Sequence, residues 1–329
     1  MAEVGKLSAS KINTYMGCSF AYFLKYVVHA DVPVNIRANF GKEIHYMLKS
    51  FYDKKFKSSE SFANYFKHRW LSSVAGDFLN GKKKSKLIVG EYPYYRRNRE
   101  TEEREESRIR IGSHIDVSFC KKEDVVGIIF GYMVLGANIL KRFYERHKEK
   151  PRPVALEKSF GVKKDELISI NGHPIRGVFD RLDNIKDNWY ITDYKTDKVL
   201  PEKNSPSLCK NPQFTLYSLA FREIFKEQEK AILYYHLRTG NVLETYRNEE
   251  DFDDLKKVLD KVVNGIENDE FIPFQNSHCG FCDCRIPCQK YLAEQDKQNK
   301  VGLEGIATRR FTHWDENIPN WMEDSEEEN

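Results

Sequence analysis

Three ionisable residues lie close together on what reads as a hairpin of two strands. The pattern predicts strands over residues 175–185 and 189–196, because the Lys-Asp-Asn between them is typical of a turn. Asp180 falls on the first strand, and Asp193 and Lys195 share one face of the second, since side chains alternate along a strand. Two carboxylates and a lysine on one face suit Mg²⁺ or Mn²⁺ beside a phosphate, because both ions prefer oxygen ligands.

The same alternation has a purely structural interpretation. Charged residues that alternate along a strand usually form its solvent-facing side. A metal site on this hairpin therefore needs support from elsewhere in the chain. Two further features bear on it, which are a cysteine cluster and a set of polar residues on other predicted elements.

The chain has seven cysteines: Cys18, Cys120, Cys209, Cys279, Cys282, Cys284 and Cys288. The odd number argues against a disulfide framework. The last four form a C-x2-C-x-C-x3-C cluster, and thiolates this close suit zinc or an iron–sulfur cluster. The spacing favours zinc slightly, but a zinc site closed by these four would leave Cys18 without a role. A group of reduced, functionless cysteines is the third interpretation.

Composition indicates a globular protein. The chain has 329 residues, 40% of them hydrophobic and 31% charged, enough for one large domain or a core with an insertion. We find no run of 18 apolar residues and no signal-peptide core, so we expect no membrane span and a cytoplasmic location. The net charge of +3 neither supports nor excludes a nucleic-acid partner, and the basic clusters at 82–84 and 96–97 are interpreted as solvated loops.

Hydrophobic periodicity predicts alternating helices and strands. Expected helices are 8–28, 39–56, 61–79, 128–147, 212–227 and 251–268; expected strands outside the hairpin are 154–160, 167–170, 231–238 and 242–247. Residues 96–110 and 201–212 are expected to be loops, the first charged and mobile. Residues 76–82 begin like a phosphate-binding loop, but Lys83 stands where Ser or Thr must hold magnesium, so we exclude a motor ATPase. Beyond residue 299 the chain becomes an acidic tail, which we interpret as disordered.

The hairpin resembles the core of the PD-(D/E)XK nuclease superfamily. Gly177-x-x-Asp180 followed by Asp193-Tyr194-Lys195-Thr196 resembles its RecB branch, which carries a D-Y-K-T signature. Gln213 and Tyr217, four residues apart on one helix, match the Q-x-x-x-Y that follows in that branch. Gly41 to His45 resembles its G-x-x-x-H, although a histidine beside an apolar stripe is also a common packed residue.

A second resemblance involves the cysteines. The serine-rich start of the chain with Cys18, together with Cys279, Cys282 and Cys288, is similar to the iron–sulfur staple of AddB-type and CRISPR-associated RecB-like nucleases. The resemblance implies a 4Fe-4S cluster that ties the two ends of the chain together. Two departures stand out, because no proline follows Cys18 and Cys284 is an additional cysteine.

The resemblance implies an α/β fold, a restriction-endonuclease-like core with a mixed central sheet flanked by helices and a helical insertion. Asp180, Asp193, His45 and the Tyr194 carbonyl would hold Mg²⁺ or Mn²⁺, while Lys195 would orient the attacking water. Gln213 and Tyr217 would position the DNA. The implied domains are the N-terminal helices (1–56), an insertion with a charged loop (57–150), the nuclease core (151–270), the cysteine cluster (271–300) and the tail (301–329). Glu157 reads equally as a residue near the site or a surface glutamate.

The implied activity is hydrolysis of DNA, as an exonuclease acting on single-stranded ends in repair, recombination or phage DNA processing. A helicase or integrase would be its partner. Two alternatives stay open. One is a CRISPR adaptation nuclease that trims spacer precursors with an integrase, and the other is a non-catalytic DNA-binding subunit. The intact pair of aspartates with Lys195 argues against the latter.

Overall fold

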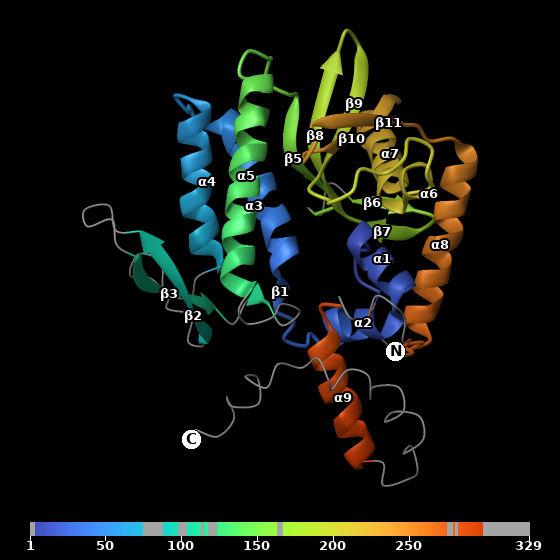
Figure 1. Cartoon of the computed structure of the whole chain (residues 1–329). Coiled ribbons are helices and arrows are strands. Elements are labelled where there is room, and N and C mark those ends of the chain that lie inside the picture. Colours follow the sequence, from blue (N-terminus) through green and yellow to red (C-terminus); the bar gives the residue numbers. More distant parts are fainter. Residues whose placement is uncertain are drawn as a thin grey trace. The chain divides into compact units, whose positions relative to one another are not determined.

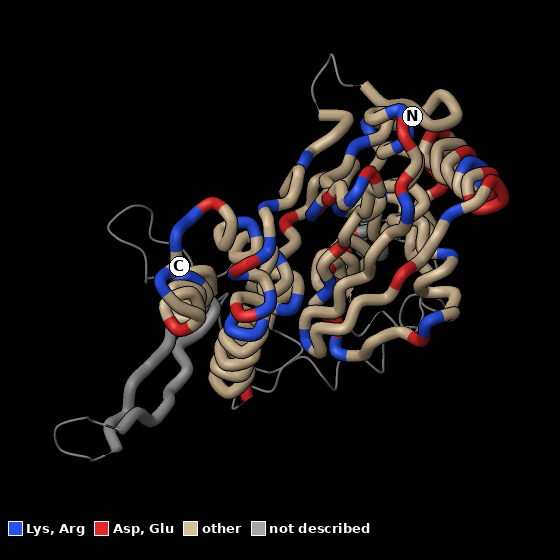
Figure 2. The backbone as a smooth tube through the Cα atoms, turned by 90° about the horizontal axis from the view of Figure 1, so that it is seen from above, with Lys and Arg blue, Asp and Glu red and all other residues tan. Residues whose placement is uncertain are grey.

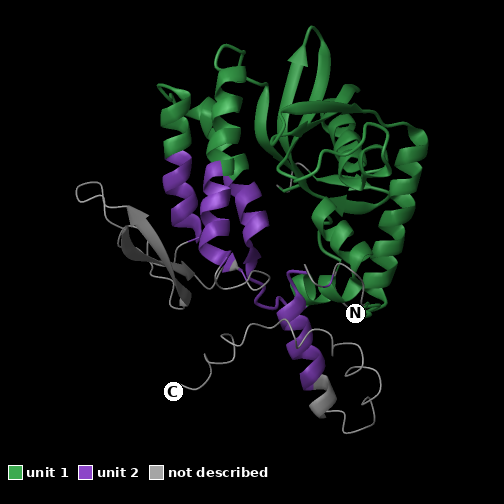
Figure 3. Ribbon diagram, viewed as in Figure 1, with its two compact units in different colours: residues 1–27, 44–64, 135–274 green, residues 28–43, 65–134, 275–329 purple. Residues whose placement is uncertain are grey.

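The structure is a computed structural model in which the chain forms two compact units (Figure 3). Unit 1 comprises residues 1–27, 44–64 and 135–274, and unit 2 comprises residues 28–43, 65–134 and 275–329. The structure describes residues 4–74, 88–97, 104–112, 115–117, 124–162, 167–274, 279 and 282–298. The predicted acidic tail, the lysines at 82–84 and the loop at 76–82 lie outside these residues.

Unit 1 is built on a five-stranded mixed sheet in the order β11-β10-β9-β8-β5 (Figure 1). Its strands are β5 (Ala155–Phe160), β8 (Gly177–Ile185), β9 (Asn188–Lys195), β10 (Glu229–His236) and β11 (Asn241–Thr245). β10 runs parallel to β9, and the other neighbours are antiparallel. The predicted α/β fold with a mixed sheet is confirmed.

The β8–β9 hairpin follows from local backbone preferences. Lys186 and Asp187 both have positive φ, at 53° and 61°, which is the two-residue turn that matches the twist of paired strands. Position 177, where β8 begins, requires glycine, because a Cβ there would collide with the ring of Phe160 on the neighbouring strand. The predicted hairpin is confirmed, with a turn one residue shorter than expected.

One face of the sheet is covered by α7 (Pro212–Phe225) and α8 (Glu249–Glu267). Asn211 caps α7 by accepting a hydrogen bond from the Gln213 amide, and Pro212 occupies the first turn, where its missing N–H costs nothing. A capping box of Asn248 and Asp251 starts α8. The sequence of α8 contains both acidic and basic residues, which Figure 2 colours along the backbone. Its inner face joins a core that includes Phe179, Leu182, Ile191, Phe214, Phe221, Leu255, Leu259 and Val262.

The opposite face of the sheet packs against the C-terminal part of α5 (Val125–His147) and of α3 (Ile36–Asp53). The Phe143 ring lies 6.0 Å from that of Tyr194 and 6.2 Å from that of Tyr235. Phe51 of α3 meets Phe143 edge-on at 5.4 Å. The sheet is thus buried on both sides, which explains why β9 reads as an almost continuous buried strand.

The N-terminal segment docks on unit 1 through its backbone. Leu7 accepts a hydrogen bond from the Arg176 amide and donates to the Pro174 carbonyl, beside β6 (Ile168–Ile170) and β7 (His173–Ile175). A single helix over 8–28 was expected, and this is wrong. The structure has α1 (Ala9–Gly17), α2 (Ser19–Tyr22) and a π-helical turn (Phe23–Val27), because Cys18 adopts an extended conformation between α1 and α2.

Unit 2 has its own aromatic packing. Trp70 of α4 (Ser59–Val74) stacks with Phe66, meets Phe40 edge-on, and donates its indole N–H to the Ile129 carbonyl. A hairpin of β2 (Ile88–Arg97) and β3 (Arg104–Gly112) and a parallel pair of β1 (Val34–Asn35) and β4 (Ile115–Asp116) complete its strands among the described residues. The cysteine-bearing α9 (Arg285–Gln298) also belongs to unit 2.

Two expectations for the connecting regions are corrected. The described residues of the predicted loop over 96–110 are strand, because β2 and β3 pair across nine registered positions. The predicted loop over 201–212 contains a short helix, α6 (Pro206–Cys209).

By length and composition alone α5 could span a membrane, although no such segment was expected. Core helices pass the same test, and α5 is packed with Phe51 and Trp70 as described above.

Candidate metal-dependent active site

Asp193 and Lys195 lie on the α7-facing side of β9, where both contact Gln213, and Asp180 lies beside them on β8. Asp180 and Asp193 are 7% and 1% exposed. Asp180 accepts a hydrogen bond of 2.8 Å from the Tyr194 amide, which fixes its carboxylate against β9. Lys195 follows two residues after Asp193, and its Nζ lies 2.9 Å from Asp193 Oδ2. The predicted shared face is therefore formed.

His45 of α3 reaches the same place from the other side of β8. Its Nε2 lies 3.0 Å from the Tyr194 carbonyl, and its Nδ1 lies 3.4 Å from Asp180 and 3.6 Å from Glu157. Burial acts to lower the pKa of His45, but the two carboxylates outweigh it and raise that pKa well above its usual value. The surroundings of His45 therefore favour the protonated ring, with Nε2 toward the Tyr194 carbonyl and Nδ1 toward the two carboxylates.

Glu157 belongs to the site. It stands opposite Asp180, because Leu156 pairs with Arg181 and Lys158 with Phe179 on the adjacent strands. Its φ of 47° is left-handed, a conformation that costs a non-glycine residue about 1–3 kcal/mol and tends to occur at functional sites. The sequence left Glu157 open between a site and a surface role. The sequence of a strand does not reveal a positive φ. Only the register of β5 against β8 places Glu157 opposite Asp180.

Asp193 is buried with an incomplete set of partners. Its Oδ1 accepts 2.9 Å from Gln213 Nε2. Its Oδ2 is buried and has the ion pair with Lys195, but it accepts no hydrogen bond from the described residues. Burial raises the pKa of Asp193 to about 6, with Lys195 opposing this and Asp180 adding to it. A buried carboxylate oxygen whose one partner is an ammonium group still has a lone pair for a second cation.

Lys195 remains charged in this setting. Burial acts to lower its pKa, but Asp193 and then Asp180 outweigh it and raise that pKa. Its Nζ also donates 3.0 Å to Gln213 Oε1. The lysine is one quarter exposed, so its ammonium group is held in place while remaining open to a substrate oxygen.

Gln213 links α7 to the catalytic strand. Its amide contacts both Asp193 and Lys195, and its Nε2 also donates 2.8 Å to the Tyr217 hydroxyl. Burial raises the pKa of Tyr217, and the Asp193 charge adds to this, so the hydroxyl stays protonated. The two residues predicted to position DNA therefore lie within the site, where Gln213 also orients both ionisable residues of β9.

The donor set fits a hard divalent cation. Ligand atoms of His45, Glu157 and Asp180 lie within 4.8 Å of one another. Asp193 and the Tyr194 carbonyl border that group through the contacts given above. Carboxylate and carbonyl oxygens with one imidazole suit Mg²⁺ or Mn²⁺ better than a soft metal, which would select sulfur ligands.

The predicted cluster cysteines are distributed between the two units. Cys18 is half-buried at the break between α1 and α2. In unit 2, the Cys282 amide donates to the Cys279 carbonyl, and Cys284 is buried one residue before α9, where Cys288 lies in the first turns. The described part of the cluster is thus a turn that leads into a helix.

Comparison with known proteins agrees with the site. A family model of the PD-(D/E)XK nuclease superfamily matches residues 6–138 and 133–289. The chain belongs to the PD-(D/E)XK nuclease superfamily, as the sequence motifs predicted. Comparison with curated proteins gives no match.

Proposed function

We propose that the protein is a metal-dependent DNA nuclease that degrades single-stranded ends. The observation that carries the proposal is the convergence of Asp180, Asp193 and Lys195 with His45 and Glu157 around one place on the β8–β9 hairpin. Membership of the nuclease superfamily supports phosphodiester hydrolysis. The preference for single-stranded ends rests on the resemblance to RecB-type enzymes.

His45, Glu157, Asp180 and Asp193 would hold Mg²⁺ or Mn²⁺, with the Tyr194 carbonyl beside them. Such an ion, when bound, lowers the pKa of water and offsets negative charge on the phosphate. Lys195 is held by Gln213 so that its ammonium group can orient the attacking water and stabilise the charge that develops on a phosphate oxygen. The buried carboxylates keep that lysine protonated.

The test is cleavage of a labelled single-stranded oligonucleotide with Mn²⁺, with Mg²⁺ and with EDTA. We expect cleavage only with metal and none from Asp180→Asn. Asp187→Asn, the same change at the exposed tip of the same hairpin, serves as the control and should cut normally. A D180N variant that cuts as fast as the wild type would refute the site.

A second comparison tests the preference for ends. A linear single strand and its covalently closed circle present the same bonds, but only the linear form has ends. We expect the linear form to be degraded and the circle to persist. Equal cleavage of both would establish an endonuclease and refute the proposed action on single-stranded ends.

We further propose that Cys18, Cys279, Cys282 and Cys288 bind a 4Fe-4S cluster. Support comes from their spacing and from the extended backbone at Cys18, which interrupts an otherwise helical segment. Anaerobically purified protein should be brown and contain iron and sulfide. Cys282→Ser should lose the colour, while Cys209→Ser, which changes a half-buried cysteine outside the set, should keep it. A colourless protein that contains zinc would contradict the cluster.

A further inference from the structure

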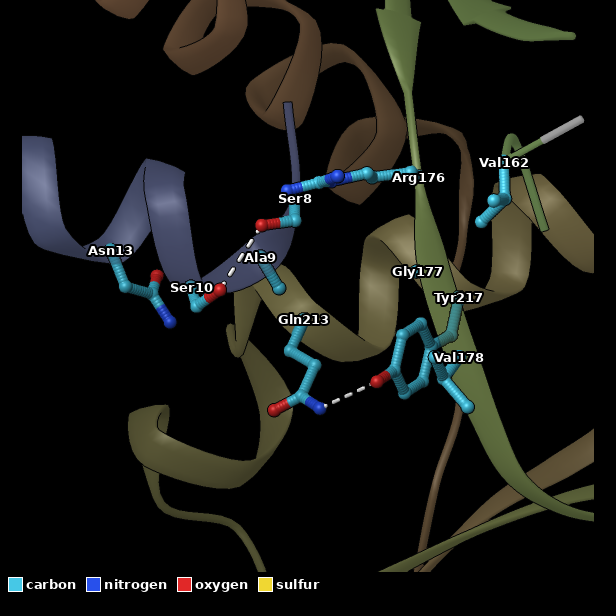
Figure 4. A pocket seen from close by; sticks show the side chains of 10 residues that line it. All are labelled: Ser8, Ala9, Ser10, Asn13, Val162, Arg176, Gly177, Val178, Gln213 and Tyr217. Carbon is cyan, nitrogen blue, oxygen red and sulfur yellow. Dashed lines mark hydrogen bonds between the residues drawn. The ribbon is translucent and has the colours of Figure 1, made fainter. Parts of the chain in front are cut away.

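A pocket with a volume of about 540 Å³ lies beside the active site, between α1, α7 and the start of β8. Gln213 and Tyr217 form one of its walls (Figure 4), and Gln213 is the residue that contacts Asp193 and Lys195. Gln213 therefore connects the wall of the pocket to the catalytic residues. A volume within about 300–1,000 Å³ is typical of pockets that hold small molecules.

The walls of the pocket combine apolar and hydrogen-bonding groups. The apolar part is made by Ala9, Val162, Val178 and the Tyr217 ring. Val162 is 56% exposed, an exposed position that a ligand in the pocket would cover. The polar part is made by Ser8, Ser10 and Asn13 of the α1 segment together with Arg176. One apolar side and one polar side match a nucleotide, which has a base and a phosphate.

The charge around the pocket is positive. Arg176 is its one charged lining residue, and the side chain extends toward Ser8 (Figure 4). Burial and the nearby Arg176 charge both lower the pKa of Lys11, so the two cations repel each other. Lys6 adds a third positive charge close by and donates to the carbonyls of Gly161 and Val162. Among the described residues no carboxylate lines the pocket, so an anion there would relieve this repulsion.

We propose that this pocket holds one unpaired nucleotide of the DNA strand next to the bond that is cut, with Arg176 on its phosphate and its base against Val162 and Val178. The inference rests on the proposed nuclease function and specifies how the same site takes its substrate. A base that enters the pocket cannot remain paired, and unpairing costs least for a strand that is already single. The pocket thus selects single-stranded DNA over duplex.

The first experiment measures binding without cleavage, using a fluorescent single-stranded oligonucleotide in Ca²⁺. Arg176→Ala should weaken binding about tenfold and reduce the salt dependence of log K by about 0.7, the value for one lost contact to a single-strand phosphate. Lys261→Ala removes an exposed positive charge on α8 and should leave both quantities unchanged. Equal losses from the two variants would mean diffuse attraction and would overturn the pocket.

The second experiment fills the pocket. Ser10 is exposed and lines it, so Ser10→Trp should fold normally, as checked by its thermal melting, and should weaken oligonucleotide binding. In wild type, replacing the base beside the cleaved bond with an abasic residue should slow cleavage about tenfold, the loss of about one base contact. That penalty should disappear in S10W.

The outcomes separate this inference from the proposed function. If the wild type cuts DNA, and R176A and S10W bind and cut DNA as the wild type does, the nuclease activity is supported and the role of the pocket is refuted. If the wild type binds DNA without cutting it, and R176A loses that binding, the proposed nuclease activity is refuted and the pocket is retained. Stronger binding of an RNA oligonucleotide than of its DNA counterpart would overturn the assignment to DNA.

Discussion

The two faces of the β8–β9 hairpin carry similar charged side chains in contrasting surroundings. On the face toward α5, Arg181 donates two hydrogen bonds to Asp183, of 2.6 and 2.9 Å, and a third of 2.8 Å to the Tyr52 hydroxyl. On the face toward α7, one oxygen of Asp193 has the ion pair with Lys195 but accepts no hydrogen bond among the described residues. The charged side chains of the first face have complete hydrogen-bond partners, whereas those of the second remain available to a cation and a phosphate.

The pKa values record the same difference. Burial acts to lower the pKa of Arg181, but the contacts with Asp183 outweigh this and raise it. On the other face burial raises the pKa of Asp193 to about 6, so the folded protein holds this carboxylate ionised at neutral pH at a cost in stability. Similar residue types therefore stabilise the fold where partners are complete and serve chemistry where they are not.

The largest effect is expected on the satisfied face. Arg181→Met leaves the half-buried Asp183 without its partner, and breaking a buried pair costs about 3–5 kcal/mol, so we expect the lower end of this range. We expect urea unfolding to show this loss, while the fraction that remains folded still cuts DNA. Unchanged stability would mean that this network does not hold the hairpin.

Lys195→Ala tests the catalytic face by its effect on cleavage. It removes the cation that faces the substrate, so kcat should fall about 10²–10³-fold, the usual effect of losing one such donor. Because the change also leaves the buried Asp193 without its ion pair, kcat is measured per folded molecule. Lys186→Ala at the exposed hairpin tip is the matched control and should cut normally. A K195A variant with normal kcat would exclude Lys195 from the reaction.

Acid should affect the satisfied face through His147. Its Nδ1 donates to the Phe143 carbonyl, and burial lowers the pKa of His147 from 6.5 to about 4. The unfolded chain thus binds a proton that the folded chain resists, and stability should fall by about 2–3 kcal/mol as the pH drops from 6.5 to 4. His147→Gln keeps a donor but cannot titrate, so its unfolding free energy should vary less over this window. An identical pH profile would contradict the role of His147.

The smallest effect is expected from Tyr52→Phe. The change removes the hydroxyl that accepts from Arg181 and leaves the ring packed against Phe51 and Phe143. We expect a loss of about 1 kcal/mol in the free energy of unfolding and no loss of cleavage. A loss as large as that of R181M would show that Tyr52, rather than Asp183, is the main partner of Arg181.

Much of the catalytic face was predictable, because its motifs are local. Asp193 and Lys195 share a face through the two-residue period of a strand, and Asp180 lies on the adjacent strand of a short hairpin. The His45 contact with the Tyr194 carbonyl joins residues 149 positions apart, so only family resemblance could suggest it. The left-handed φ of Glu157 and the break at Cys18 depend on long-range packing, and residue spacing carries no trace of either.

The satisfied face was not anticipated at all. Neither Arg181 nor Asp183 belongs to a motif, and their surroundings depend on α3 and α5, which come from distant parts of the chain. The pocket beside Gln213 was missed for the same reason. It needs the N-terminal segment to pair with the residues before β8, and no local pattern indicates that pairing.

The most direct measurement compares Asp193→Asn with Asp183→Asn, the same chemical change on opposite faces of one hairpin, by urea unfolding without metal and by Mn²⁺-dependent cleavage. D193N should lose cleavage and retain or gain stability, because it removes a buried charge that the fold holds at a cost. D183N should lose stability and keep cleavage in its folded fraction. If both variants lose cleavage and stability together, or if D193N cuts normally, the division between the two faces is wrong.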